Sequence, residues 1–293
     1  MNLDLAKPIS ILVLGATGLI GSTIFKRLSR NSDFDVYGTV RNSFDKSFFS
    51  DSQALKLFDG FEFSKYHKWN KLFQLMRPNV VINCLGITKH REYGNDPLKV
   101  IPTNSYFPHY LNSLCQDSGA RLVHISSDCV FSGGKGEYLE SDTPDAGDLY
   151  GRSKALGELY QGPAITIRTS TIGHELHTEY GLLNWFLMQN GSCHGFTKAF
   201  FSGLTTNELA KIIEQHVIPN RNLQGLYHLG ASRIAKFDLL NLIAREYDKK
   251  ILIVRDESFV IDRSLNSDKF CEETGYLPHS WERLIQEMHE DLE

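Results

Sequence analysis

The sequence predicts an α/β protein built on a doubly wound parallel sheet, a Rossmann fold, with a smaller C-terminal domain. The apolar, largely β-branched run Ile9–Leu14 ends directly at a glycine, as a buried parallel strand does before a tight turn. Leu19–Arg30 then has apolar residues at the spacing of a helix with one buried face. Similar strands and helices alternate through the first 170 residues, and this alternation is typical of a doubly wound sheet.

The remaining elements of the sheet domain follow from the same patterns. The expected strands are Ile9–Leu14, Asp35–Val40, Ala54–Phe58, Val80–Cys84, Arg121–Ser126 and Ala164–Arg168, and the expected helices are Leu19–Arg30, Lys65–Arg77, Leu98–Ser118 and Ser153–Tyr160. Pro102 and Pro108 predict an interruption near the start of the Leu98–Ser118 helix, because proline lacks the amide donor.

The alternation weakens after Thr169, and this change predicts the domain boundary. Glycine, histidine and aromatic residues cluster between Gly173 and Gly203. We expect residues 1–170, with about 204–230, to form the Rossmann domain. Thr206–Val217 and Leu226–Leu229 are the segments expected to return to the sheet domain. Residues 171–203 and 231–293 are the expected substrate-binding domain.

Composition excludes several classes of function. The chain has 293 residues, 41% of them hydrophobic, which is enough for a proper core. A net charge of −4 with dispersed Lys and Arg predicts no nucleic-acid partner. No apolar stretch is long enough for a membrane span, and residues 1–8 lack a signal-peptide core, so a cytoplasmic protein is expected. Five cysteines without metal-ligand spacing predict free thiols and no metal site.

The turn after the first strand has the features of a dinucleotide site. Gly15, Gly18 and Gly21 recur every third residue, which differs from the Gly-x-Gly-x-x-Gly spacing of many dehydrogenases. Glycines at such a turn let the backbone approach a pyrophosphate, and the helix amino terminus favours its charge. We expect Gly15, Thr17, Gly18, Leu19 and Ile20 to contact the cofactor.

The end of the second strand indicates which cofactor is bound. Arg41 stands where an NAD site would place an acidic residue against the ribose. A guanidinium offers planar donors to a 2′-phosphate and stacks on adenine, so NADPH is expected, with NADH possible. Asp59, after the third strand, is expected to reach the adenine amine.

Tyr150, Lys154 and Ser127 carry the expected chemistry. Tyr150 and Lys154 are four residues apart, so they share one face of a helix and the ammonium is expected to lower the pKa of the phenol. Tyr150 would then donate a proton to a carbonyl that receives hydride. Ser127, at the end of a predicted strand, would hold that carbonyl.

At these motifs the chain resembles the extended short-chain dehydrogenase/reductase superfamily, and within it the dTDP-4-dehydrorhamnose reductase group. The matching segments are Gly15–Gly21, Asn83–Gly86, Ser126–Gly133, Tyr138-x-Glu140, Tyr150–Glu158, Arg168–Ser170 and Arg263–Leu265. The resemblance implies Ser127, Tyr150 and Lys154 as a catalytic triad that reduces C4 of an NDP-4-keto-6-deoxy sugar. It also implies cofactor contacts from Cys84, Leu85, Gly86 and Asn104, and a homodimer is common among such relatives.

The expected substrate contacts lie around the same strand ends. They are Thr88, Lys89, Ser127, Asp128, Cys129, Arg168 and Phe200. Lys89 follows the fourth strand, where it would meet a pyrophosphate, and Phe200 lies where a nucleotide base would stack. A nucleotide sugar is therefore the expected partner.

Cys129 leaves two alternatives open. Related 4,6-dehydratases carry glutamate at this position, so its absence removes the proton acceptor that dehydration requires. GDP-fucose synthase-like epimerase-reductases resemble this site in having a cysteine here, which forms an acid/base pair with a histidine. His174 would be that histidine in this chain, and His177 is the other candidate. A further alternative is a non-catalytic NADP-binding regulatory subunit, against which the intact Ser127, Tyr150 and Lys154 argue.

Overall fold

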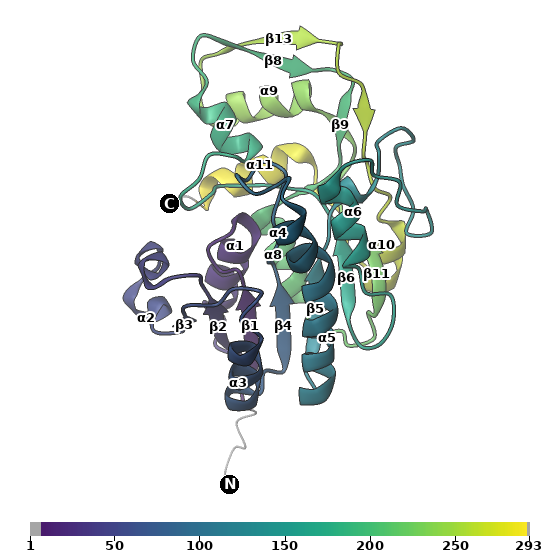
Figure 1. Ribbon diagram of the computed structural model, residues 1–293. Helices are drawn as coiled ribbons and strands as arrows, with labels where there is room; N and C mark the ends of the chain where they lie inside the picture. Colours follow the sequence, from purple (N-terminus) through teal and green to yellow (C-terminus); the bar gives the residue numbers. More distant parts are fainter. Residues whose placement is uncertain (1–6, 292–293) are drawn as a thin grey trace.

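A seven-stranded parallel sheet forms the larger part of the molecule. The computed structural model describes residues 7–291. The strand order is β11-β6-β5-β4-β1-β2-β3, and every neighbouring pair is parallel. The strands are β1 (Ile9–Leu14), β2 (Phe34–Thr39), β3 (Leu57–Phe58), β4 (Val80–Asn83), β5 (Arg121–Ile125), β6 (Ile165–Arg168) and β11 (Gly225–His228). The predicted Rossmann fold is confirmed (Figure 1).

Helices cover both faces of this sheet because its strands are apolar on both faces. Along β1, Ile11 and Val13 belong to one buried cluster, and Leu12 and Leu14 to another. The first cluster includes residues of α1 (Leu19–Leu28) and α8 (Thr206–Ile212), which also pack on each other. The second includes residues of α3 (Tyr66–Met76) and α5 (Phe107–Ser118). These two layers fix the sheet between them.

Two predicted elements differ from the structure in their bounds. The third strand is only Leu57–Phe58, because Asp51–Ala54 forms the short helix α2, which Ser50 caps. The sixth helix, α6, spans Leu149–Leu156 and starts earlier than predicted, because Asp148 caps it by accepting a hydrogen bond from the Gly151 amide.

The predicted interruption by proline is a change of helix type. Helix α4 (Pro97–Ile101) continues through a π-helical turn, Pro102–Tyr106, into α5. Pro102 begins the π-helical turn and Pro108 follows its end, so the change of helix type lies where the two amide donors are missing. A π-turn bulges outward and often marks a functional position.

A smaller group of elements lies beyond the carboxyl ends of the sheet strands (Figure 1). It contains a parallel pair, β8 (Ser192–Phe196) with β13 (Leu252–Asp256), and a three-stranded sheet ordered β12-β9-β14. Those three strands are Ile234–Ala235, Ala199–Phe201 and Ile261–Asp262. The short strands β7 (Thr171–Ile172) and β10 (Leu204–Thr205) pair with each other, and the helices are α7 (Leu182–Met188), α9 (Lys236–Glu246) and α11 (Trp281–Glu290). Helix α10 (Asp268–Thr274) instead packs on β11 at the edge of the large sheet (Figure 1).

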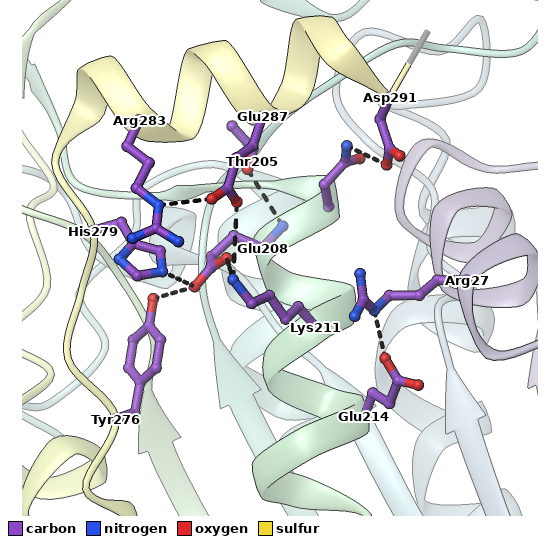
Figure 2. Close-up of polar contacts among 11 residues, drawn as sticks. Arg27, Thr205, Glu208, Lys211, Glu214, Tyr276, His279, Arg283, Glu287 and Asp291 are labelled. Carbon is purple, nitrogen blue, oxygen red and sulfur yellow. Dashed lines mark hydrogen bonds and ion pairs between the residues drawn. The ribbon is translucent and has the colours of Figure 1, made fainter. Parts of the chain in front are cut away.

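Paired charges join the last helix to the sheet domain. Glu208 of α8, whose side chain is 1% exposed, accepts a hydrogen bond from Tyr276 at 2.9 Å and lies 3.5 Å from Lys211. Arg283 of α11 donates to Glu287 at 2.7 Å, and Glu287 also faces Lys211. Figure 2 shows these residues, which with Thr205 and His279 we call the C-terminal cluster.

Neither a metal site nor a membrane span is found in residues 7–291. That part of the chain holds no group of three or more His, Cys, Asp or Glu side chains able to bind a metal ion. It also holds no helix with the length and hydropathy needed to cross a membrane.

Candidate active site

The glycine turn after β1 has the geometry that a dinucleotide requires. Gly15 has φ +76°, a conformation that favours glycine, and a Cβ on Gly21 would lie 2.2 Å from the Gly15 carbonyl oxygen. Helix α1 therefore packs closely on the turn. Its N-cap, Gly18, supplies no side-chain cap, and its first turn has no acidic residue, so amide donors remain for a phosphate.

The other residues predicted for this turn surround it. Thr17, Leu19 and Ile20 are half-buried at the start of α1. On the opposite side, the loop after β4 comes close, since a Cβ on Gly15 would lie 3.0 Å from the Leu85 side chain and 3.4 Å from the Cys84 carbonyl oxygen. The structure thus brings together the first and fourth strand ends, as predicted from the sequence.

Arg41 and Asp59 lie at the neighbouring strand ends. Arg41 is exposed just beyond β2, and its carbonyl accepts a hydrogen bond from the Gly60 amide, which holds the β2 and β3 ends together. Asp59 forms an ion pair with Lys46 at 2.7 Å. Sequence reasoning missed this ion pair, which balances the charge of Asp59 at the edge where Arg41 is expected to meet a 2′-phosphate.

Asn104 positions two active-site segments at once. From the π-turn, its side-chain oxygen accepts from the Ile87 amide at 2.8 Å, and its amide nitrogen donates to the Ile87 carbonyl at 3.0 Å. The same nitrogen donates to Ser153 of α6 at 3.1 Å. Asn104 is fully buried, so its role here is to fix the Gly86–Ile87 loop against α6.

A close approach of α6 to the turn after β5 sets the position of Tyr150. A Cβ on Gly151 would lie 2.1 Å from the Cys129 carbonyl oxygen, so only glycine permits this contact. Ser127 is the N-cap of that turn and accepts a hydrogen bond from the Cys129 amide at 3.1 Å. Tyr150, next to Gly151, is thereby held beside Ser127 and Cys129.

The pKa of Tyr150 differs from the sequence-based expectation. Burial raises it, the neighbouring Cys129 raises it further, and the Ser127 hydroxyl opposes the rise. Lys154 instead donates to the Ile125 carbonyl at 2.7 Å. The expectation that Lys154 lowers the pKa of Tyr150 is therefore wrong for this arrangement, and Tyr150 carries its proton at neutral pH.

Lys154 is buried between β5 and the β4 end. Burial lowers its pKa from 10.5 to about 8, while Glu158 and Cys84 oppose that change. Burial also raises the pKa of the Cys84 thiol to about 12, with Lys154 opposing. Lys154 is thus a cation at neutral pH that loses its charge under mildly alkaline conditions.

Three cations gather near Asp128 and Cys129, beside Ser127. We call these five residues the cleft cluster: Lys89, Asp128, Cys129, Lys236 and Arg263. Burial raises the pKa of Asp128, while Arg263 and Lys236 lower it. Arg263 donates to the Phe131 carbonyl at 2.8 Å and has the Cys129 sulfur at 3.5 Å. Within residues 7–291, Lys236 has no hydrogen bond or ion pair, so three cations share one carboxylate.

Sequence reasoning missed Lys236, although it carries a signal. It is the first residue of α9, whose N-cap Ala235 supplies no side-chain cap. A cation at a helix amino terminus opposes the helix dipole. Lys236 therefore does not stabilise α9, and this placement indicates a role in the cleft.

Arg168 is not available to a substrate. Its side chain is 1% exposed and donates two hydrogen bonds to Glu158, at 2.8 and 2.7 Å. Glu158 also accepts from the Ser126 hydroxyl at 2.7 Å. The expectation that Arg168 binds substrate is corrected: it joins β6 to the end of α6, because a buried guanidinium needs a carboxylate partner.

Phe200 lies in the smaller group of elements, and the Arg233 side chain covers one face of its ring. The Arg233 guanidinium lies 3.3 Å from its ring centroid and is held by Asp262 at 2.7 Å. Arg233 is 42% exposed, so the stack presents a planar cation to solvent. Thr88 and Lys89 are exposed on the loop after β4.

The structure does not bring Cys129 and His174 into contact. Cys129 faces Arg263, Ser127 and Asp128, and burial raises its pKa to about 12. His174 bonds to the Tyr247 hydroxyl at 2.8 Å, and burial lowers its pKa. His177 stacks on Phe48 instead.

Comparison with known proteins identifies the family. The sequence model described as RmlD substrate binding domain matches residues 9–292. The chain belongs to this family. The dTDP-4-dehydrorhamnose reductase of Aggregatibacter actinomycetemcomitans is 24% identical over 94% of this chain and 97% of that protein.

Other curated relatives match over a shorter span. Methionine adenosyltransferase 2 subunit beta of Danio rerio is 30% identical over 159 residues, which are 50% of this chain and 42% of that protein. The match therefore spans less than half the length of that relative.

Solved structures share the fold at low identity. The dTDP-4-dehydrorhamnose reductase of Bacillus anthracis, solved with NADP, superposes with a TM-score of 0.80 and 21% identity, covering 97% of this chain and all of that one. Bordetella bronchiseptica WbmG, solved with NAD and UDP, has a TM-score of 0.78 and 15% identity, covering 99% and 96%.

Proposed function

We propose that this member of the RmlD substrate binding domain family is an NADPH-dependent reductase of the C4 keto group of an NDP-4-keto-6-deoxy sugar. The observation that carries the proposal is the meeting of Ser127, protonated Tyr150 and cationic Lys154 at the strand ends beside the glycine turn. The full-length relative and the NADP-bound neighbour support the same reaction class.

The residues present fit the cofactor. The uncapped amino terminus of α1 accommodates a pyrophosphate, and the exposed Arg41 suits a 2′-phosphate. When bound, NADPH supplies the hydride that turns the C4 carbonyl into an alkoxide. NADH remains the alternative, since a neighbour was solved with NAD.

The chain's own residues then handle the proton and the charge. Ser127 donates a hydrogen bond to the keto oxygen and polarises it. Tyr150 transfers its phenolic proton to that oxygen as the alcohol forms. Buried Lys154, which bonds the Ile125 carbonyl, would hold the nicotinamide ribose of the cofactor. Tyr150 recovers its proton from solvent before the next turnover.

The cleft cluster suits the anionic part of a nucleotide sugar. Lys89, Lys236 and Arg263 exceed the charge of Asp128 by two, which matches a diphosphate. The Phe200–Arg233 stack offers a planar surface for a base.

Turnover tests the proposal directly. We expect NADPH oxidation with one 4-keto-6-deoxy sugar nucleotide among the dTDP, UDP and GDP forms, run in deuterated water. A product without carbon-bound deuterium indicates a simple 4-reductase. Deuterium at C3 or C5 would favour the epimerase-reductase alternative with Cys129 and His174. No oxidation with any of the three would contradict the proposal.

A non-catalytic NADP-binding subunit is the second candidate, and one observation favours it. Relatives named methionine adenosyltransferase 2 subunit beta match half of this chain at about 30% identity. NADPH binding without turnover would support it. The domain division given above, a homodimer and a cytoplasmic location belong to the proposal as well.

A further inference from the structure

A segment between β7 and α7 crosses the cofactor end of the sheet, and we call residues 174–181 the strap. His177 of the strap stacks on Phe48, with ring centroids 5.0 Å apart and planes 18° apart. Tyr180 lies under the Arg91 guanidinium at 5.1 Å. The strap therefore contacts two segments that are distant in the sequence.

Those two segments lie on opposite sides of the glycine turn. Phe48 ends the short helix Ser43–Phe48, which follows β2 and Arg41. Arg91 belongs to the loop that follows β4. The sheet order β4-β1-β2 places β1, and with it the turn Gly15–Gly18, between them. A strap anchored at both places crosses the carboxyl end of β1.

The strap has internal bonds and is attached to the rest of the molecule near its amino-terminal end, where His174 bonds the Tyr247 hydroxyl at 2.8 Å. Glu175 accepts hydrogen bonds from the Gly181 amide at 2.7 Å and the Thr178 hydroxyl at 2.6 Å. Leu176 packs against the main core cluster. The two aromatic contacts, by contrast, lie on the partly exposed side, and within residues 7–291 no hydrogen bond joins His177 or Tyr180 to the sheet domain. Such contacts break more easily than a buried core.

We propose that the strap closes over the bound dinucleotide and must release Phe48 and Arg91 for the cofactor to leave. This inference rests on the proposed NADPH site. It assigns His177 and Tyr180 to cofactor retention, whereas the chemistry stays with Ser127, Tyr150 and Lys154.

Stopped-flow fluorescence of NADPH release tests the strap. We expect His177→Ala and Tyr180→Ala each to speed release about fivefold, the effect of losing one aromatic or cation–π contact, with a larger effect in the double variant. His177→Phe and Tyr180→Phe keep the ring contacts and should release NADPH at the unchanged rate. Trp185→Ala, in α7 beside the strap, is the control for nearby aromatic loss.

The outcomes separate the strap from the cofactor site. Hydrogen exchange of residues 174–181 should slow when NADPH binds, and less so in the double alanine variant. If the double alanine variant binds NADPH normally and releases it at the unchanged rate, the proposed role of the strap is wrong and the proposed cofactor site still stands. Failure of the unchanged protein to bind NADPH would overturn the proposed cofactor site, and the strap with it.

Discussion

The cleft cluster and the C-terminal cluster are both rich in charge, but their charges are balanced differently. In the C-terminal cluster, Lys211 lies between Glu208 and Glu287, and Arg283 also pairs with Glu287 (Figure 2). In the cleft cluster, three cations share Asp128, and Lys236 has no hydrogen-bonding partner within residues 7–291. Balanced charges stabilise a fold, whereas a surplus of one sign indicates a ligand of the other.

Tyr150→Phe should give the largest effect, because the site loses its proton donor. We expect the turnover number to fall about 1000-fold, within the range of general acid catalysis. The unfolding midpoint in urea and the NADPH dissociation constant should change little, since the ring stays. A variant that keeps its activity would exclude Tyr150 as the acid.

The pH dependence should come next. Because burial lowers the pKa of Lys154 to about 8, turnover should decline about tenfold per unit above that pH. Between this value and 10.5 the unfolded chain binds the extra proton, so this residue's contribution to stability rises with pH while activity falls. Lys154→Arg should move the decline to higher pH. A flat profile to pH 10 would show that the charge of Lys154 is not needed.

Glu208→Ala should affect stability and leave catalysis unchanged. The buried Tyr276 hydroxyl would lose its acceptor, so we expect a loss of about 2 kcal/mol in the free energy of unfolding. Glu287→Ala, at a half-buried position, should cost less than about 0.5 kcal/mol. If Glu208→Ala lowers turnover at a temperature where the variant is folded, the C-terminal cluster is not purely structural and the contrast with the cleft cluster is wrong.

Lys236→Met tests the contrast between the cleft cluster and the C-terminal cluster by a smaller expected effect. Removing a cation without a partner should raise the KM for the sugar nucleotide about tenfold, the loss of one charge-assisted contact, and leave the unfolding midpoint unchanged. Lys211→Met is the matched control, and it should lower stability slightly without altering KM. Equal effects of the two substitutions on KM would contradict the distinction.

Local patterns predicted most of the sheet because they are repeated along the chain. The strand Ile9–Leu14 was predicted to the residue, since its apolar run ends at a glycine that the turn requires. The third strand was overestimated because the capped helix Asp51–Ala54 replaces its start. The π-turn and the positioning role of Asn104 could not be predicted from local patterns either. Both depend on contacts with Ile87 and Ser153, which are distant in the sequence.

The sequence by itself determined the Rossmann sheet, the glycine turn and the residues Ser127, Tyr150 and Lys154, because strand runs, turn glycines and helical spacing are local properties. Only the tertiary structure decided that Arg168 is buried against Glu158, that Lys154 bonds the Ile125 carbonyl, and that Lys236 joins the cleft cluster. Burial and charge balance depend on segments far apart in the chain, so they follow from packing.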